Sequence, residues 1–81
     1  MNSPTVDIIR SLLSEDFGLP EDLEDSQELF SSGLMDSTDL VNLIMALEQA
    51  FGIRVSPLDV NYDNLDSLLR MEQLIKRVSV G

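Results

Sequence analysis

Residues 36–52 read DSTDLVNLIMALEQAFG, a pattern that predicts a long amphipathic helix in the middle of the chain. Asp36 or Ser37 can cap the start of this helix, where acidic side chains also suit the positive end of the helix dipole. Gly52 favours a stop at the other end. We therefore expect a helix over about 37–51, with one apolar face formed by Leu40, Leu43, Ile44, Leu47 and Phe51.

A second helical pattern precedes this segment. Ser3 is a suitable N-cap, and Pro4 fits the first position of a helix. Gly18 ends the pattern, and we expect a helix over about 4–16. Its apolar face is formed by Val6, Ile9 and Leu13, flanked by Ile8 and Leu12.

Two further helices are expected after the central one. A serine–proline pair predicts a short helix over about 57–60, and the next segment, 61–64, is rich in turn-forming residues. A last helix is expected over about 67–78, with Asp66 or Ser67 as its cap. The side chains expected to face inward from it are Leu68, Leu69, Ile75 and Val78.

The connection between the first two main helices, residues 18–35, is long and acidic. Apolar residues at intervals should pin it to the core; they are Leu19, Leu23, Leu29, Phe30, Leu34 and Met35. Asp25 and Glu28 have the spacing of a capping box, which predicts a short helical turn near 26–30. No strand pattern is present, so we expect an all-α fold in one domain spanning 1–81. Its architecture should be a small four-helix bundle, with three main helices and a short one.

The composition excludes several classes of function. The 81 residues are 43% hydrophobic and 25% charged, which is typical of a globular domain, and they include no Cys and no His. These absences argue against a self-contained hydrolase, a zinc site or a redox protein. The spacing of Asp59, Asn61 and Asp63 is similar to the opening of a calcium loop. However, Asn64 and Arg70 stand where that loop needs Gly and Glu, so no metal site is expected.

The charge is strongly acidic and unevenly placed. The net charge is −10, and residues 1–50 contain eleven acids against one base, Arg10. Such a surface repels nucleic acid and anionic membranes but favours encounters with basic partner proteins. No targeting sequence or membrane-spanning stretch is visible, so we expect a cytoplasmic protein. A monomer is the default expectation, since the sequence does not decide the oligomeric state.

The sequence around the central helix resembles the carrier-protein family, which includes acyl, peptidyl and aminoacyl carrier proteins. The resemblance runs from about residue 29 to residue 78. The motifs that carry it are the apolar–Phe pair Leu29-Phe30, the Gly33-Leu34 approach, the Asp36-Ser37 pair and the helix exit Phe51-Gly52-Ile53.

The resemblance implies a specific modification. In this family a serine is esterified by 4′-phosphopantetheine taken from coenzyme A, and the thiol of this arm holds cargo as a thioester. The matching residue is Ser37, with Asp36 as its acidic neighbour, and backbone N–H groups at the helix start are expected to donate hydrogen bonds to the phosphate. The chain would then be a non-catalytic carrier. Its partners would be a phosphopantetheinyl transferase, an adenylating ligase or acyltransferase, and a downstream transferase or synthase.

One departure from the family pattern concerns the residue after the serine. It is usually Leu, but here it is Thr38, while Asp66-Ser67-Leu68 spells the common triplet elsewhere. We reject this second triplet as an attachment site because too few residues follow it to leave room for the next helix of the pattern. The Gly-Leu-Met approach and the Phe-Gly-Ile exit are also missing around it. Ser67 is better interpreted as a helix cap.

Residues beside the core face of the central helix are candidates for partner binding. Val41 and Met45 lie one turn apart near Thr38, and we expect them to remain exposed for a partner, although core packing is the alternative. Asp39 and Glu48 could dock against basic residues of partner enzymes or could simply form a solvated helix face.

The cargo is indicated by the C-terminal half. The pattern over 55–67 is similar to that of D-alanyl and related discrete aminoacyl carriers, whereas fatty-acid carriers tend to have more acids on the second helix, where this chain has Asn42 and Gln49. The leading hypothesis is therefore a stand-alone carrier of a small acyl or aminoacyl group. The alternatives are a fatty-acid or polyketide acyl carrier protein and, from another class, an acidic helical interaction module without a prosthetic group.

Overall fold

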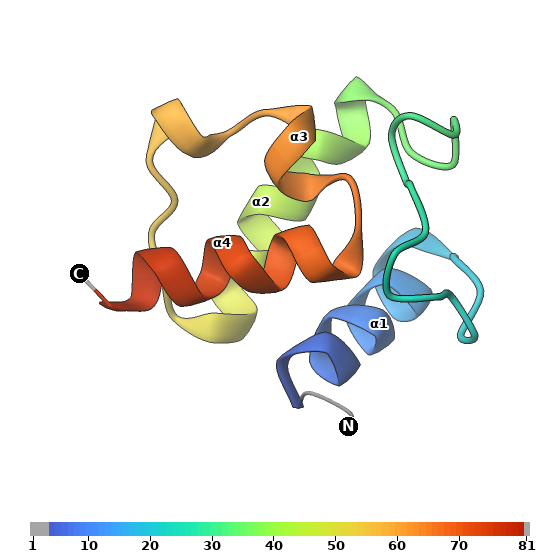
Figure 1. Ribbon diagram of the computed structural model, residues 1–81, viewed down its shortest axis with the longest axis horizontal. Helices are drawn as coiled ribbons and strands as arrows, with labels where there is room; N and C mark the ends of the chain where they lie inside the picture. The colour runs from blue at the N-terminus through green and yellow to red at the C-terminus, as the bar shows by residue number, and fades with distance from the viewer. Residues whose placement is uncertain (1–3, 81) are drawn as a thin grey trace.

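The computed structural model describes residues 4–80, which fold into α-helices without any strand (Figure 1). The elements in chain order are α1 (Pro4–Phe17), α2 (Ser37–Phe51), the 3₁₀ turn η1 (Pro57–Asp59), α3 (Tyr62–Leu65) and α4 (Leu68–Val80). The all-α prediction of three main helices and one short helix is therefore confirmed. Ser3, the expected cap of α1, lies outside the described residues.

A single hydrophobic core holds the helices together. Helix α1 packs against α2 and α4, and α3 packs against α4. The fully buried side chains of the core come from all four helices and from the connection before α2; they include Ile9, Leu13, Leu29, Leu43, Leu47, Leu65, Leu68, Met71 and Leu74. The apolar faces predicted for α1 and α2 are thus the faces that the structure buries or half-buries, apart from the exposed flanking residue Ile8.

Two leucines expected to face inward are instead exposed. Leu69 follows the buried Leu68 directly in α4, and consecutive helical residues point about 100° apart, so only one of them can reach the core. Leu34 follows Gly33, whose positive φ of 87° turns the chain outward, and Met35 takes the core position next to it.

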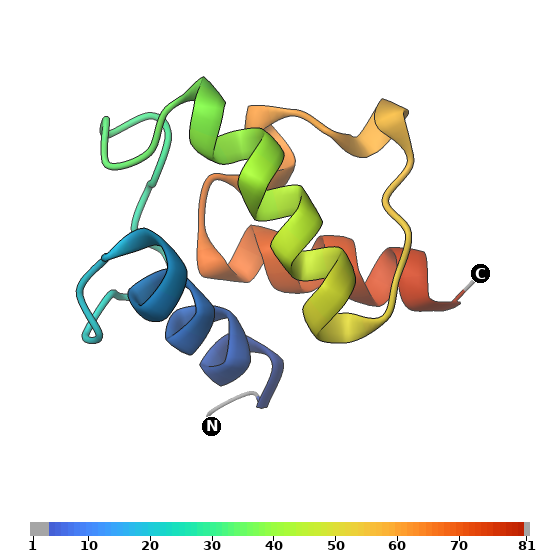
Figure 2. The same cartoon turned by 180° about the vertical axis from the view of Figure 1, so that it is seen from behind.

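The connection 18–35 is pinned to the core as predicted, but not by a helical turn. Backbone hydrogen bonds tie it to distant elements: the Leu29 N–H donates to the Asp66 carbonyl (2.8 Å), and the Leu69 N–H donates to the Asp25 carbonyl (3.2 Å). The expected turn near 26–30 and its capping box are wrong. The Asp25 carboxylate pairs with Arg10 of α1, so this long-range ion pair replaces the local contact with Glu28. Seen from behind, the connection lies beside α1 and leads into the start of α2 (Figure 2).

The segment between α2 and α4 also differs from the prediction. The short helix expected at 57–60 is only the 3₁₀ turn η1, and the real short helix is α3, in the stretch expected to be a turn. The reason is local: the Asn61 side chain accepts the Asn64 N–H (2.9 Å) and so caps a helix instead of closing a turn.

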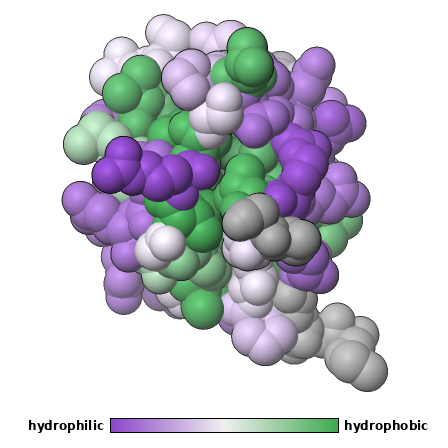
Figure 3. Space-filling view, turned by 90° about the vertical axis from the view of Figure 1, so that its left-hand side faces the viewer, coloured by the Kyte–Doolittle hydropathy of each residue, from purple (hydrophilic) through white to green (hydrophobic). Residues whose placement is uncertain are grey.

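Figure 3 views the molecule from the side that carries η1 and the end of α4, where hydrophobic side chains are framed by hydrophilic ones. On η1, Leu58 is 91% exposed.

Candidate functional site

Ser37 is the first residue of α2, and its side chain is exposed. Asp36 is the N-cap, with extended backbone angles, so the chain enters the helix directly at Ser37. Within the part of the chain that the structure describes, no hydrogen bond engages the Ser37 hydroxyl. The oxygen is therefore accessible to a second protein and does not need to break an internal contact before it reacts.

A shallow depression of about 380 Å³ lies beside Ser37. It is lined by Phe30, Ser31, Met35, Asp36, Ser37 and Tyr62. The rings of Phe30 and Tyr62 contact each other with centroids 5.2 Å apart and planes tilted by 51°. No local pattern in the sequence marks Tyr62 as part of this site, because it lies 25 positions after Ser37 and reaches the depression only through the packing of α3.

Asp36 caps the start of α2, and this bears on the expectation that N–H groups at the helix start bind the phosphate. Its carboxylate accepts the backbone N–H groups of Thr38 (3.0 Å) and Asp39 (3.1 Å), and its carbonyl accepts the Leu40 N–H (3.1 Å). In this conformation the Thr38, Asp39 and Leu40 N–H groups already donate to Asp36, so these three are not free to donate to a phosphate as the prediction expected.

This capping arrangement still fits a phosphate ester on Ser37, provided that the ester points away from the helix. None of the residues that line the depression is basic, and the Asp36 carboxylate is next in sequence to Ser37, so electrostatic repulsion would direct an anionic group toward solvent. An exposed hydroxyl that makes no internal hydrogen bond can carry such a group without any rearrangement of the helix. The residues present thus suit a tether that remains mobile and is not clamped to the protein.

The predicted exposure of the apolar residues on α2 is confirmed. Val41 and Met45 are 59% and 53% exposed, and Thr38, one turn before Val41, is also exposed. These three residues follow Ser37 along the same side of the helix, at spacings of three and four residues. The core-packing alternative for Val41 and Met45 is therefore wrong.

The two acids proposed for docking have bonds within the chain. The Asp39 carboxylate accepts the Asp36 N–H (3.1 Å), and the Glu48 carboxylate accepts the Val55 N–H (2.9 Å). Both side chains are half-buried, so neither is simply part of a solvated face. Glu48 ties the end of α2 to the segment that leads into η1. A role in docking would come in addition to these structural roles.

The Asp66-Ser67-Leu68 triplet is buried. Asp66 is 9% exposed, Ser67 is 6% exposed, and Leu68 is fully buried in the core. The Ser67 hydroxyl accepts the Arg70 N–H (3.2 Å), which confirms its predicted role as a cap of α4. A hydroxyl in this position is not presented to a second protein as that of Ser37 is.

The residues that mimic a calcium loop have other partners. The Asp59 carboxylate pairs with Arg77 (3.3 Å), and Asn61 caps α3. Across residues 4–80, no cluster of three or more potential metal-ligating side chains is found. No helix in this range is both long and apolar enough to cross a membrane.

Comparison with known proteins bears directly on this site. A family model described as "Phosphopantetheine attachment site" matches residues 7–71, which include Ser37 and the whole of α2. The chain belongs to this family. It is a carrier protein, and the prosthetic group of the family is covalently attached 4′-phosphopantetheine, as the sequence predicted.

Curated relatives refine this assignment. The chain is 32% identical over 73 residues to the D-alanyl carrier proteins of two strains of Lactobacillus delbrueckii subsp. bulgaricus, an alignment that covers 90% of this chain and 86% of each relative. It is also 32% identical over 65 residues to the D-alanyl carrier protein of Abiotrophia defectiva, with 80% of each chain covered. The similarity therefore extends over most of the fold and is not confined to the serine motif.

Proposed function

We propose that Ser37 is the attachment residue for 4′-phosphopantetheine and that the chain, as one domain over 1–81, is a non-catalytic aminoacyl carrier. The observation that supports this proposal most strongly is the exposed hydroxyl at the first position of α2. It lies inside the matched region and makes no hydrogen bond to any of residues 4–80. Two other serines follow an aspartate. Ser67 is buried and caps α4, and Ser26 lies in the connection before α2 and not at a helix start.

The chain's own contribution to the attachment reaction is to present an oxygen in a fixed place. The Ser37 oxygen forms the phosphoester bond and loses its proton, while the pyrophosphate linkage of coenzyme A breaks and its nucleotide part departs. We assign the proton to a base of the transferase, because Asp36, the carboxylate that lines the depression, is engaged as the cap of α2. When bound, the arm supplies a thiol that holds a carboxylic acid as a thioester.

The proposed cargo is a small amino acid, with D-alanine as the first candidate. This choice is supported by the names of the relatives and by the pattern over 55–67. An adenylating ligase would load the cargo, and a downstream transferase would remove it. We place these reactions in the cytoplasm, where ATP is available to the ligase. Docking would use Thr38, Val41 and Met45 beside Ser37.

The attachment residue is tested by intact-mass measurement. The chain is co-expressed with a phosphopantetheinyl transferase, and the purified protein should gain the mass of one arm. Ser37→Ala should gain none, whereas Ser67→Ala, which changes the same residue type in the second triplet, should still gain one. A wild-type chain that remains unmodified, or an arm that persists in Ser37→Ala, would contradict the proposal and favour an interaction module without a prosthetic group.

The cargo is tested separately on the modified protein. It is incubated with ATP and an adenylating ligase for D-alanine, and in parallel with a fatty-acid transacylase and acyl donor. We expect thioester formation only in the first reaction. Loading only by the transacylase would overturn the aminoacyl assignment and leave the carrier assignment intact.

A further inference from the structure

Asp66, in the buried second triplet, is bonded to the segment just before the Ser37 site. One oxygen of its carboxylate accepts three consecutive backbone N–H groups, those of Leu29 (3.1 Å), Phe30 (2.7 Å) and Ser31 (3.1 Å). The other oxygen accepts the Ser31 hydroxyl (2.5 Å). A side chain between α3 and α4 thus holds a segment that lies 35 to 37 positions earlier in the sequence.

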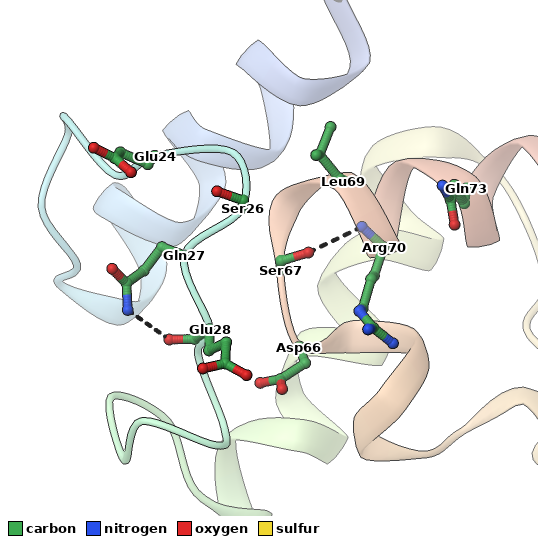
Figure 4. A pocket seen from close by; sticks show the side chains of 9 residues that line it. All are labelled: Glu24, Ser26, Gln27, Glu28, Asp66, Ser67, Leu69, Arg70 and Gln73. Atoms are coloured by element: carbon green, nitrogen blue, oxygen red, sulfur yellow. Dashed lines mark hydrogen bonds between the residues drawn. The ribbon is translucent and has the colours of Figure 1, made fainter.

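The surroundings of Asp66 show that these bonds are its main interactions. It lies in the wall of a polar cleft of about 780 Å³ between the segment 24–28 and the start of α4, where Ser67 also bonds to the Arg70 backbone (Figure 4). No ion pair to Asp66 is found in the described part of the chain. Burial raises the pKa of its carboxyl, but the hydrogen bonds from Ser31, Phe30 and Leu29 outweigh burial, and the net pKa lies below the ordinary value. The group is therefore an anion held by backbone N–H dipoles.

The segment that Asp66 holds also forms part of the wall of the depression beside Ser37. Phe30 and Ser31 both line that depression, and Phe30 is in ring contact with Tyr62 on its other side. Ser31 is exposed, so apolar burial does not fix it, and its N–H and hydroxyl both bond to Asp66, while its neighbour Phe30 packs against the core. The carboxylate therefore connects the buried triplet to the surface next to Ser37.

We propose that Asp66 is a positioning residue for the modification of Ser37, because its carboxylate fixes the Phe30–Ser31 wall that a phosphopantetheinyl transferase meets beside the serine hydroxyl. This inference rests on the proposed function of Ser37. Misplacement of a contact surface by about 1 Å can reduce a rate by up to about 100-fold. Loss of the Asp66 carboxylate should thus affect attachment even in molecules that remain folded.

The test compares variants of the full-length apo protein as substrates of a phosphopantetheinyl transferase with coenzyme A. For Asp66→Ala we expect kcat/KM to fall by about tenfold or more, since Phe30 and Ser31 lose their bonds to the carboxylate while the bond from Leu29 to the backbone carbonyl remains. Asp66→Asn keeps an oxygen acceptor and should recover part of the loss, and Ser31→Ala should show a smaller fall. Ser67→Ala is the matched control, because it removes a buried cap in the neighbouring residue without touching the wall.

A second measurement separates positioning from stability. Urea denaturation gives the folded fraction of each variant, and kinetics are compared at a temperature where all are folded. In Asp66→Ala the amide NMR signals of Ser31 and Ser37 should shift, whereas in Ser67→Ala they should not. If Asp66→Ala does not fold, the test rests on Asp66→Asn and Ser31→Ala. The inference would be overturned if both of these variants had the same kcat/KM as the wild type.

The outcomes distinguish this inference from the proposed function. If the wild-type chain gains no arm on Ser37, the proposed function itself fails. If the wild type is modified and folded Asp66→Ala has the same kcat/KM, only the positioning role of Asp66 fails. An equal fall in Ser67→Ala and Asp66→Ala would also overturn the positioning role, because it would trace the effect to general destabilisation.

Discussion

Asp36 and Asp39 cap one another at the start of α2. The Asp36 carboxylate accepts the Asp39 N–H, the Asp39 carboxylate accepts the Asp36 N–H, and each of these bonds is 3.1 Å long. This reciprocal pair holds the turn that carries Ser37 and places two negative charges at the positive end of the helix dipole. The acid before the serine therefore has a structural role that is independent of any chemistry at the hydroxyl.

The capping pair predicts a measurable loss of stability in Asp36→Ala. This change removes the acceptor of the Thr38 and Asp39 N–H groups, and the free energy of unfolding should fall by about 1 kcal/mol. Asp36→Asn keeps an acceptor oxygen and should lose less. Urea denaturation followed by circular dichroism measures both. The control is Asp22→Ala, which removes an exposed acid in the connection before α2. If its free energy of unfolding fell as much as that of Asp36→Ala, the capping explanation would be contradicted.

The exposed position of Val41 predicts a variant that is folded but poorly recognised. Val41→Asp places a charge among the exposed side chains of Val41 and Met45 beside Ser37. Attachment of the arm and loading of cargo should therefore both slow. Its far-UV circular dichroism should stay native, and its free energy of unfolding should stay within about 0.5 kcal/mol of the wild type. Asn42→Asp adds the same charge at the next exposed position of α2 and should be modified normally. Equal slowing in both variants would point to charge alone.

The bond between Glu48 and Val55 predicts a local effect at the end of α2. Glu48→Ala leaves the half-buried Val55 N–H without its acceptor, which should cost about 1–2 kcal/mol of unfolding free energy. Glu48→Gln keeps an oxygen acceptor and should recover much of this loss. Hydrogen exchange at the Val55 amide should speed up in Glu48→Ala. An unchanged exchange rate would show that the bond does not hold this segment.

Local sequence signals were sufficient for the three main helices. Pro4, the Asp36 cap and Gly52 each mark a helix end where the structure has one, because propensity and capping act within a few residues. The same signals failed for α3. Its four residues are too few to show a helical period, and Asn61 favours both a turn and a helix cap.

The features that the sequence did not predict depend on partners far along the chain. Asp25 was expected to form a capping box with Glu28, but Arg10 of α1 takes its carboxylate. Tyr62 reaches the depression at Ser37 only through the packing of α3, and Asp66 reaches the segment 29–31 across more than 30 positions. The periodicity of a single sequence reports on residues a few positions apart, so it does not reveal contacts between distant segments. The place of Ser37 at the start of α2 could be predicted because its motif is contiguous, whereas the wall beside it could not.

The anion at Asp66 predicts how stability depends on pH. The hydrogen bonds from the segment 29–31 lower the pKa of Asp66 in the folded chain below its ordinary value of 3.8, so the unfolded chain binds the proton more readily. The stabilisation is therefore fully present above the ordinary pKa and is lost as the pH falls through the lower, folded value. In Asp66→Asn this group cannot titrate, and that part of the pH dependence should vanish.

Urea denaturation from about pH 5 to about pH 2 measures this difference. The free energy of unfolding should fall more steeply for the wild type than for Asp66→Asn, and the gap between them should narrow as the pH decreases. The other titratable groups that line the cleft with Asp66 are Glu24, Glu28 and Arg70. Glu28→Gln controls for the neighbouring carboxylate and should keep the wild-type slope. Parallel curves for the wild type and Asp66→Asn would show that this carboxylate is not held as an anion by the Leu29–Ser31 segment.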